Sequence, residues 1–502
     1  MRSARATIAT LAASVICAVG LVAIPPAADA GGGHGHDNGH GKCHRKNNSL
    51  HKLLECVTLK GVLEHQKAFQ RIANRNDDNR ASGTSGYDRS VDYVAWRMKK
   101  AGYKVTRQEF EFNKFSELGP SALEQTSPDA VSYVEGTDFG ATPHSEPGDV
   151  TAPVTAVDIQ LGLGNTSTSG CEPEDFTGFP AGNIALIQRG DCFFEVKAEN
   201  AVAAGASGVL FFNQGNADDP ERLEIPAVTL GNDYTGDIPA LSATYALGAE
   251  LAGIANLEMR LFANVSRVPT TTENLIAESR RGDRDNVIMA GAHLDSVPEG
   301  PGINDNGSGS SALLEVAEQM AKVKPRNQLR FAWWGAEEDG TVGSEHYVLS
   351  LSEEELAELE LYLNFDMVAS PNYGLFIYDG DGSGFGLEGP PGSDDIEALF
   401  ERFYAHRGIP TEPTAFDGRS DYFDFINNGV PAGGLFTGAE DIKTPEQAEK
   451  WGGQAGVAFD PCYHAACDTI RNLSWRALSL NSDAMAYVTY LYATGKKVIN
   501  TD

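Results

Sequence analysis

Three segments in the second half of the chain are almost continuously apolar, namely residues 286–293, 328–334 and 361–365. Runs of this kind are typical of strands whose two faces are both covered by helices. Between the first two runs, apolar residues recur at the 3.6-residue spacing of a helix from Leu313 to Met320. Because strands and helices alternate in this way from about residue 265, we predict an α/β fold with a mixed, mostly parallel sheet flanked by helices.

The chain before residue 130 has a similar pattern. Apolar residues between Leu63 and Ile72 predict an amphipathic helix, and the stretch that begins at Ser90 predicts a second helix, which ends at Gly102. Residues 103–112 then alternate between apolar and polar positions, as a strand does. We therefore assign this region to the same domain as the later strands.

The middle of the chain differs in character, because it has short β-type runs, many glycines and prolines, and few long helical patterns. Residues 184–188 and 209–212 are predicted strands, with a small-residue helix at 197–204 between them. This composition favours a small β-rich domain inserted into a larger one. The predicted ranges are a discontinuous larger domain at 58–130 and 265–500 and an insert at 131–264.

The first 57 residues are predicted to carry a targeting segment and a leader. Arg2 and Arg5 precede an apolar run, and Ala28-Asp29-Ala30 matches the small-residue pattern of a signal cleavage site. We predict a signal peptide at 1–30, followed by a flexible leader at 31–57 that is rich in glycine and histidine. The mature protein is therefore expected to be secreted.

Composition narrows the class of partner. The 502 residues carry a net charge of −31, which repels phosphate backbones and argues against nucleic acid and anionic membranes as partners. After the signal peptide no stretch approaches the roughly 20 apolar residues of a membrane-spanning helix. We expect a monomer that does not associate with membranes after signal cleavage.

Cysteine usage agrees with export. Seven cysteines are present, and Cys17 falls in the signal peptide, which leaves six in the mature chain. An even number in an exported protein favours disulfides, although six cysteines allow fifteen connectivities. Because neighbouring cysteines fall within one apparent structural unit, we predict local pairing. The predicted pairs are Cys43/Cys56, Cys171/Cys192 and Cys462/Cys467.

Polar groups that can bind a metal follow each of the three apolar strands. His293 ends the first strand, Glu337 and Glu338 follow the second, and Asp366 follows the third. Asp295 lies two residues beyond His293. In open α/β sheets, ligands bind beyond the carboxyl ends of the strands, so these side chains are expected at one edge of one sheet.

Two further ligands are predicted from loops. Asp305 lies in the glycine-rich segment GINDNGSGSS before a helix, and His464 lies in PCYHAACDT between Cys462 and Cys467. Zinc takes imidazole and carboxylate readily, and a carboxylate can bridge two ions. A bound metal lowers the pKa of water from about 15.7 to about 7, and a carboxylate outside the metal shell can take the proton. The adjacent pair Glu337 and Glu338 can supply one ligand and one base.

Other hydrolytic or nucleotide-binding motifs are absent from the sequence. It has no H-E-x-x-H, no G-x-S-x-G, no Walker A loop and no C-x-x-C zinc module. A metal site assembled from separate strands is therefore favoured over a helix-borne zinc site or a serine nucleophile.

In these residues the chain resembles the M28 zinc aminopeptidases. The matching segments are GAHLDS, GINDNGSG, WGAEEDGTVGS, NFDM and PCYHAACDT. The resemblance implies two zinc ions, one held by His293, Asp305 and Asp366 and the other by Asp305, Glu338 and His464. It further implies that Glu337 is the general base, that Asp295 orients His293, and that Tyr463 stabilises the oxyanion. The expected reaction is hydrolysis of the N-terminal peptide bond of peptides or proteins by a metal-bound hydroxide.

The insert resembles a protease-associated (PA) domain in the segments around Cys171, residues 184–213 and residues 225–231. Such domains are usually taken as lids or substrate-access modules. Some secreted relatives also bind calcium near the C-terminal helix. Here Asp483 is present, but Ser479 stands where a second acid would be expected, which argues against calcium.

Several alternatives share this scaffold. A carboxypeptidase or another metal hydrolase would use a similar site, and a glutaminyl cyclase would use one zinc. A non-catalytic binding protein would be expected to have lost ligands, whereas all five are present. The sequence leaves the preferred N-terminal residue of the substrate open.

Overall fold

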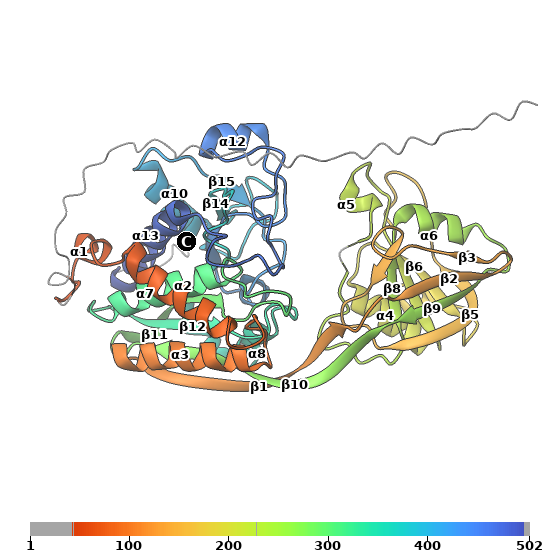
Figure 1. Cartoon of the computed structure of the whole chain (residues 1–502), viewed down its shortest axis with the longest axis horizontal. Helices are drawn as coiled ribbons and strands as arrows, with labels where there is room; N and C mark the ends of the chain where they lie inside the picture. Colours follow the sequence, from red (N-terminus) through yellow and green to blue (C-terminus); the bar gives the residue numbers. More distant parts are fainter. Residues whose placement is uncertain (1–42, 44, 227, 496–502) are drawn as a thin grey trace, which may run out of the picture. The chain divides into compact units, whose positions relative to one another are not determined.

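The computed structural model describes residues 43, 45–226 and 228–495 (Figure 1). The predicted signal peptide at 1–30 and residues 31–42 of the predicted leader lie outside the described residues. Across the described part of the chain, no helix is long and apolar enough to cross a membrane. The strands within these described residues form two eight-stranded sheets.

The first sheet is mixed, as predicted. Four strand pairs are parallel: β12–β11, β11–β13, β13–β16 and β14–β15. The strands in spatial order are β1 (Lys104–Glu117), β10 (Val265–Glu278), β12 (Asn327–Trp334), β11 (Asp283–His293), β13 (Leu359–Phe365), β16 (Ala432–Phe436), β14 (Phe376–Tyr378) and β15 (Glu412–Thr414). The long antiparallel pair β1–β10 is seen as a ribbon in Figure 1.

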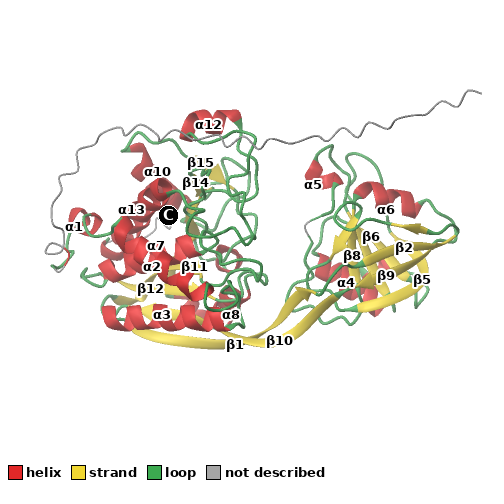
Figure 2. Cartoon of the chain, in the orientation of Figure 1, coloured by secondary structure: helices red, strands yellow, loops and turns green. Residues whose placement is uncertain are grey.

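Helices cover both faces of this sheet (Figure 2). One face packs against α1 (Leu50–Leu54), α2 (Leu59–Ala73), α3 (Ser85–Ala101), α7 (Gly307–Met320), α10 (Ser393–Ala405) and α13 (Trp475–Thr494). The other face packs against α8 (Val342–Leu349), α9 (Glu353–Ala357) and α11 (Tyr422–Asn427). A further helix, α12 (Pro445–Trp451), contributes Trp451 to the core. The predicted α/β/α arrangement is confirmed.

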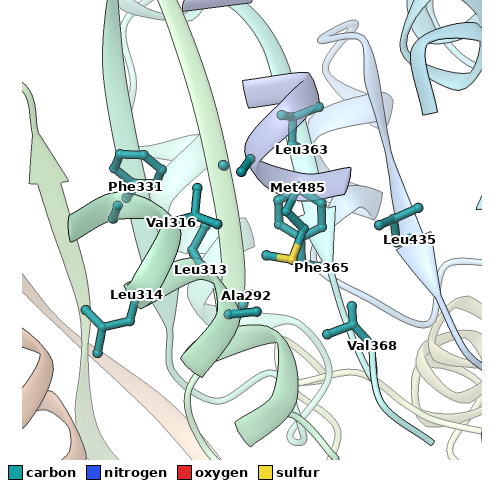
Figure 3. Close-up of a cluster of buried hydrophobic side chains, with 14 of the residues drawn as sticks. Ala292, Leu313, Leu314, Val316, Phe331, Leu363, Phe365, Val368, Leu435 and Met485 are labelled. Carbon is teal, nitrogen blue, oxygen red and sulfur yellow. The ribbon is translucent and has the colours of Figure 1, made fainter. Parts of the chain in front are cut away.

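Strand β11 shows why its sequence is almost continuously apolar. Ile288, Ala290 and Ala292 point into the core that contains α7, whereas Val287 and Met289 point into the core on the opposite face. Side chains on alternating positions of a strand face opposite sides, so a strand covered twice needs apolar residues throughout. Figure 3 shows part of the core that contains α7. Its labelled residues are Ala292, Leu313, Leu314, Val316, Phe331, Leu363, Phe365, Val368, Leu435 and Met485.

The second sheet contains a parallel run, β5–β6–β7–β8, extended by antiparallel strands. Its spatial order is β3 (Val131–Ser132), β2 (Ala122–Ser127), β9 (Glu258–Ala263), β5 (Gly148–Val157), β6 (Ile184–Gln188), β7 (Gly208–Phe212), β8 (Ala240–Ala243) and β4 (Phe139–Ala141). The short helices are η2 (Pro173–Phe176), α4 (Phe194–Ala203), α5 (Pro220–Leu223) and α6 (Tyr245–Ala252). Strand β2 pairs in this sheet although it precedes the predicted start of the insert at 131.

The predicted leader at 31–57 extends too far. Residues Leu50–Leu54 form α1, and Leu53 is fully buried in the main core. Order therefore begins before Thr58, because Leu53 and Val57 are both buried in the main core and Leu54 packs against it. Cys171–Cys192 and Cys462–Cys467 form disulfides, and Cys43 and Cys56 are also disulfide-bonded.

Candidate active site

The three predicted strands lie side by side in the order β12–β11–β13 and run parallel, so their carboxyl ends meet at one edge. His293 is the last residue of β11, and Asp366 directly follows β13. The Nε2 atom of His293 lies 3.3 Å from Oδ1 of Asp366. His293 is almost fully buried, with 1% of its surface exposed. The sheet thus brings together groups that are 73 residues apart in the sequence.

Asp305 lies between two histidines. Its Oδ1 is 3.3 Å from Nε2 of His293, and its Oδ2 is 3.2 Å from Nε2 of His464. On the far side, Nε2 of His464 is 3.0 Å from Oε2 of Glu338. The five predicted ligands therefore form one continuous chain of contacts, with Asp305 in the middle.

The three other predicted site residues surround this chain. Oε2 of Glu337 lies 3.7 Å from Nε2 of His293, and Oδ1 of Asp295 lies 3.5 Å from Nδ1 of the same imidazole. The ring of Tyr463 stacks on the ring of His464, with centroids 3.8 Å apart. All eight predicted catalytic and metal-binding residues thus lie in this cluster.

The cluster holds more acidic groups than the histidines balance, and the pKa values reflect this. Burial raises the pKa of Glu337 well above its usual value and raises that of Glu338 to about 7. Burial acts to lower the pKa of His293, but the carboxylates of Glu337 and Asp366 outweigh it and raise this pKa well above the usual value. At Asp305 burial acts to raise the pKa, but the hydrogen bonds to His293 and His464 outweigh burial and lower the pKa below its usual value. A site of this charge is suited to cations.

The backbone at the site adopts strained conformations. Ala336, directly before Glu337, has φ of 54°, Met367, directly after Asp366, has φ of 44°, and His464 has φ of 51°. Left-handed backbone at such residues costs of order 1–3 kcal/mol each and persists only where the surroundings enforce it. These three conformations therefore destabilise the fold locally, and each lies at or next to a site residue whose orientation it sets.

Sequence reasoning missed several supporting residues. Arg80, which is fully buried, donates from Nε to the carbonyl oxygen of Pro301 (2.9 Å) and from its terminal nitrogens to those of Leu294 and Gly302. Ser420 donates to Oδ2 of Asp366 at 2.7 Å. Arg80 comes from a loop between helices, far along the chain from the strand ends, so no spacing pattern marked it.

The cluster opens into a cleft. Most of the lining is acidic or apolar, and among the described lining residues Arg419 is the only cationic one. The lining comprises Asp305, Glu337, Glu338, Asp366, Met367, Tyr378, Thr414, Ala415, Asp417, Arg419, Ser420, Phe436, Ala439, Asp441 and Tyr463. Arg419 contacts Oε1 of Glu440 at 2.9 Å and donates to the hydroxyl of Tyr463 at 3.3 Å.

Disulfide Cys462–Cys467 encloses Tyr463 and His464, as predicted. We expect replacement of both cysteines by serine to lower kcat/KM by about ten-fold or more, because the loop that places His464 loses its clamp. The unfolding free energy should fall by only about 2 kcal/mol, because the loop closed by the bond is short. Steady-state kinetics and denaturant unfolding measure the two effects.

The same double substitution at Cys171 and Cys192 is the control, because that disulfide belongs to the second sheet's domain. It should leave kcat/KM unchanged. An equal loss of activity from both double variants would contradict a special role for the Cys462–Cys467 bond.

Comparison with known proteins identifies the family. Residues 274–489 match the family model of peptidase family M28, and residues 150–251 match that of the PA domain. An aminopeptidase from Pseudomonas aeruginosa is 55% identical over 450 residues, covering 90% of this chain and 84% of that protein. The chain belongs to peptidase family M28. It is an enzyme, a metallo-aminopeptidase, and it carries a PA domain.

Further relatives of this M28 peptidase are also aminopeptidases. Leucine aminopeptidase 2 from Trichophyton rubrum is 38% identical over 452 residues, covering 89% of this chain and 86% of the relative. An aminopeptidase from Aneurinibacillus sp. strain AM-1 has a similar structure, with a TM-score of 0.68 at 27% identity over 90% of this chain and 98% of its own. A zinc aminopeptidase from Bacillus subtilis also has a similar structure, with a TM-score of 0.56 at 26% identity. The match covers 88% of this chain and 96% of the Bacillus subtilis protein.

Proposed function

We propose that this M28 peptidase is a secreted aminopeptidase that uses two zinc ions. His293, Asp305 and Asp366 would hold one ion, and Asp305, Glu338 and His464 the other. Each set combines imidazole and carboxylate groups, which zinc prefers. One relative with solved structures supports zinc as the metal, because it is a zinc aminopeptidase from Bacillus subtilis.

One observation carries the assignment of two ions. The two oxygens of Asp305 face different histidines, at 3.3 Å from His293 and 3.2 Å from His464. A carboxylate in this position can give one oxygen to each of two ions. Oε1 of Glu338 also fits a metal site, because it is buried and has no hydrogen-bond partner among the described residues. A buried carboxylate oxygen without a partner is costly, and a cation would satisfy it.

The residues around the proposed ions have separate tasks. Zinc supplies activation of water and polarisation of the scissile carbonyl. Glu337 takes a proton from the attacking water and returns it to the leaving amine. Oδ1 of Asp295 lies 3.5 Å from Nδ1 of His293, so this carboxylate would orient the imidazole with Nε2 facing the site. The hydroxyl of Tyr463 donates to the oxygen of the substrate that becomes negatively charged.

Secretion is supported by the disulfides as well as by the N-terminal sequence. Disulfides persist in oxidising environments and are rare in the cytosol of most organisms. The six cysteines of the predicted mature chain are all disulfide-bonded. Mass spectrometry of the protein from culture medium tests this proposal, because a mature N-terminus near residue 31 is expected.

Elemental analysis tests the number of ions. We expect two zinc ions per active chain, loss of activity on chelation and recovery when zinc is returned. Asp305→Asn should weaken both sites, because it alters the bridging group. Asp339→Asn is the matched control, because Asp339 adjoins Glu338 in the sequence but belongs to neither proposed set, so both ions should remain. A fully active enzyme with one tightly bound ion would refute the two-ion proposal.

A further inference from the structure

The loop between β11 and α7 carries two site residues but contains neither helix nor strand. It spans residues 294–306 and includes Asp295 and Asp305. Main-chain ladders do not fix such a segment, so its position depends on the side chains that bond to its backbone. Arg80 binds its carbonyl groups, as described above. Its N–H groups near Asp305 need a separate partner.

That partner is Asp468, which has 1% of its surface exposed. Its Oδ2 accepts from the backbone N–H of Asp305 at 3.0 Å and from that of Asn304 at 3.1 Å. Its Oδ1 lies 2.9 Å from the same N–H of Asn304. The backbone carbonyl of Asp468 accepts from Ile303 at 3.1 Å. One residue thus holds three consecutive residues that end at the proposed bridging ligand.

Asp468 belongs to the loop that carries the other histidine. It directly follows Cys467, whose disulfide encloses His464, and its N–H donates to the carbonyl of Ala465 at 2.9 Å. The loops that carry Asp305 and His464 are therefore joined to each other at this carboxylate. Within those loops, Oδ2 of Asp305 and Nε2 of His464 are 3.2 Å apart.

We propose that Asp468 is a positioning residue that sets the spacing between Asp305 and His464 for the second zinc ion. The inference rests on the proposed function, because it presupposes that these two side chains share an ion. A shift of a ligand loop by a fraction of an ångström changes the coordination distances, and outer partners of metal ligands typically contribute 10–100-fold to metal affinity.

A carboxylate is needed at this place for a simple reason. It is an acceptor at both oxygens and can receive both backbone N–H groups. In Asp468→Asn one oxygen becomes an amide nitrogen, which is a donor and faces a donor. In either orientation of the amide, its nitrogen lies next to the N–H of Asn304, so it repels the loop that carries Asp305 although the side chain keeps its size.

Asp460 offers a matched control. It is also 1% exposed and lies in the same network, where it accepts from the side-chain amide of Asn304 (2.6 Å), that of Asn472 (2.8 Å) and the N–H of Cys462 (2.9 Å). No hydrogen bond joins it to the backbone of Asp305 among the described residues. Asp460→Asn therefore perturbs the side chain of Asn304 in the same network, while the backbone N–H groups of Asn304 and Asp305 keep their bonds to Asp468.

The test measures zinc affinity by competition with a chelator, together with thermal unfolding of the zinc-free proteins. We expect Asp468→Asn to bind one of its two zinc ions 10–100-fold less tightly than the wild type, and Asp460→Asn to change the affinity for either ion by less than about three-fold. The zinc-free variants should unfold at similar temperatures. At saturating zinc, Asp468→Asn should recover most of its kcat.

Two results would overturn the inference. The first is that Asp468→Asn binds zinc as tightly as the wild type does. The second is that Asp468→Asn and Asp460→Asn lose zinc affinity equally. If Asp468→Asn does not fold, the smaller Asp468→Ser, which still accepts one bond, must show the same preferential loss of zinc. A wild-type protein that binds no zinc would instead refute the proposed function, so the two failures are distinguishable.

Discussion

Glu337→Gln should keep both zinc ions and lose most of the turnover. Glutamine has nearly the same size and can still lie 3.7 Å from Nε2 of His293, where Oε2 of Glu337 lies now. Its amide cannot take a proton from the attacking water. General-base catalysis contributes typically 10²–10⁴-fold, so kcat should fall by about this factor while KM changes little. Steady-state kinetics and elemental analysis of one preparation measure both quantities.

The neighbouring residue supplies the comparison. Oε2 of Glu338 contacts His464 at 3.0 Å, so Glu338→Gln should lower zinc affinity first and activity as a consequence. Added zinc should restore part of the activity of Glu338→Gln and none of that of Glu337→Gln. If Glu337→Gln emptied the site while Glu338→Gln kept it filled, the roles of base and ligand would be exchanged.

The layers of the peptidase domain could be predicted from the sequence because they depend on periodicity. The three apolar runs correspond to β11, β12 and β13, and the stripe from Leu313 to Met320 corresponds to α7. Gly102 ends α3 with φ of 102°, a conformation that glycine adopts without a steric penalty. Burial on both faces of a strand, or on one face of a helix, leaves a regular trace in the order of residues.

Other elements left no such trace. Helix α1 has five residues and one buried side chain, Leu53, so it is too short for a periodic pattern. Strands β14 and β15 have three residues each and take their place from their neighbours. The second sheet gains β2 from outside the predicted insert, because strand pairing joins segments that are distant in sequence. Boundaries set by tertiary contacts of this kind are not encoded locally.

The site divides in the same way. The proposed ligands were found because each is a metal-binding residue type at a strand end or in a marked loop. Arg80 and Asp468 were missed because they act on backbone atoms of the loop between β11 and α7. Backbone groups look alike in every sequence, so contacts to them appear only when the loops are folded. The signal for Asp468 was its position beside Cys467 in a segment already singled out.

The charges of the cleft favour a substrate with a free amino terminus. After the three carboxylates proposed as zinc ligands are set aside, Glu337, Asp417 and Asp441 remain on the lining. The single lining cation, Arg419, contacts Glu440 at 2.9 Å, so its charge is already balanced. A C-terminal carboxylate would meet no free cation among these residues. An α-ammonium at about 4 Å from a carboxylate gains roughly 4 kcal/mol at an effective dielectric of 20.

The decisive comparison uses one peptide in three forms: free, N-acetylated and C-amidated. Acetylation removes the positive charge at the amino terminus and adds a group that the acidic cleft does not attract, so cleavage should fall by about 10²-fold or more, which corresponds to at least about 2.7 kcal/mol of lost transition-state binding. Amidation removes only the negative charge at the distant end, so kcat/KM should stay within about two-fold. Mass spectrometry of the products should show single residues released from the free and the amidated peptides. Cleavage that survives acetylation and fails on amidation would show that the cleft recognises the carboxyl terminus.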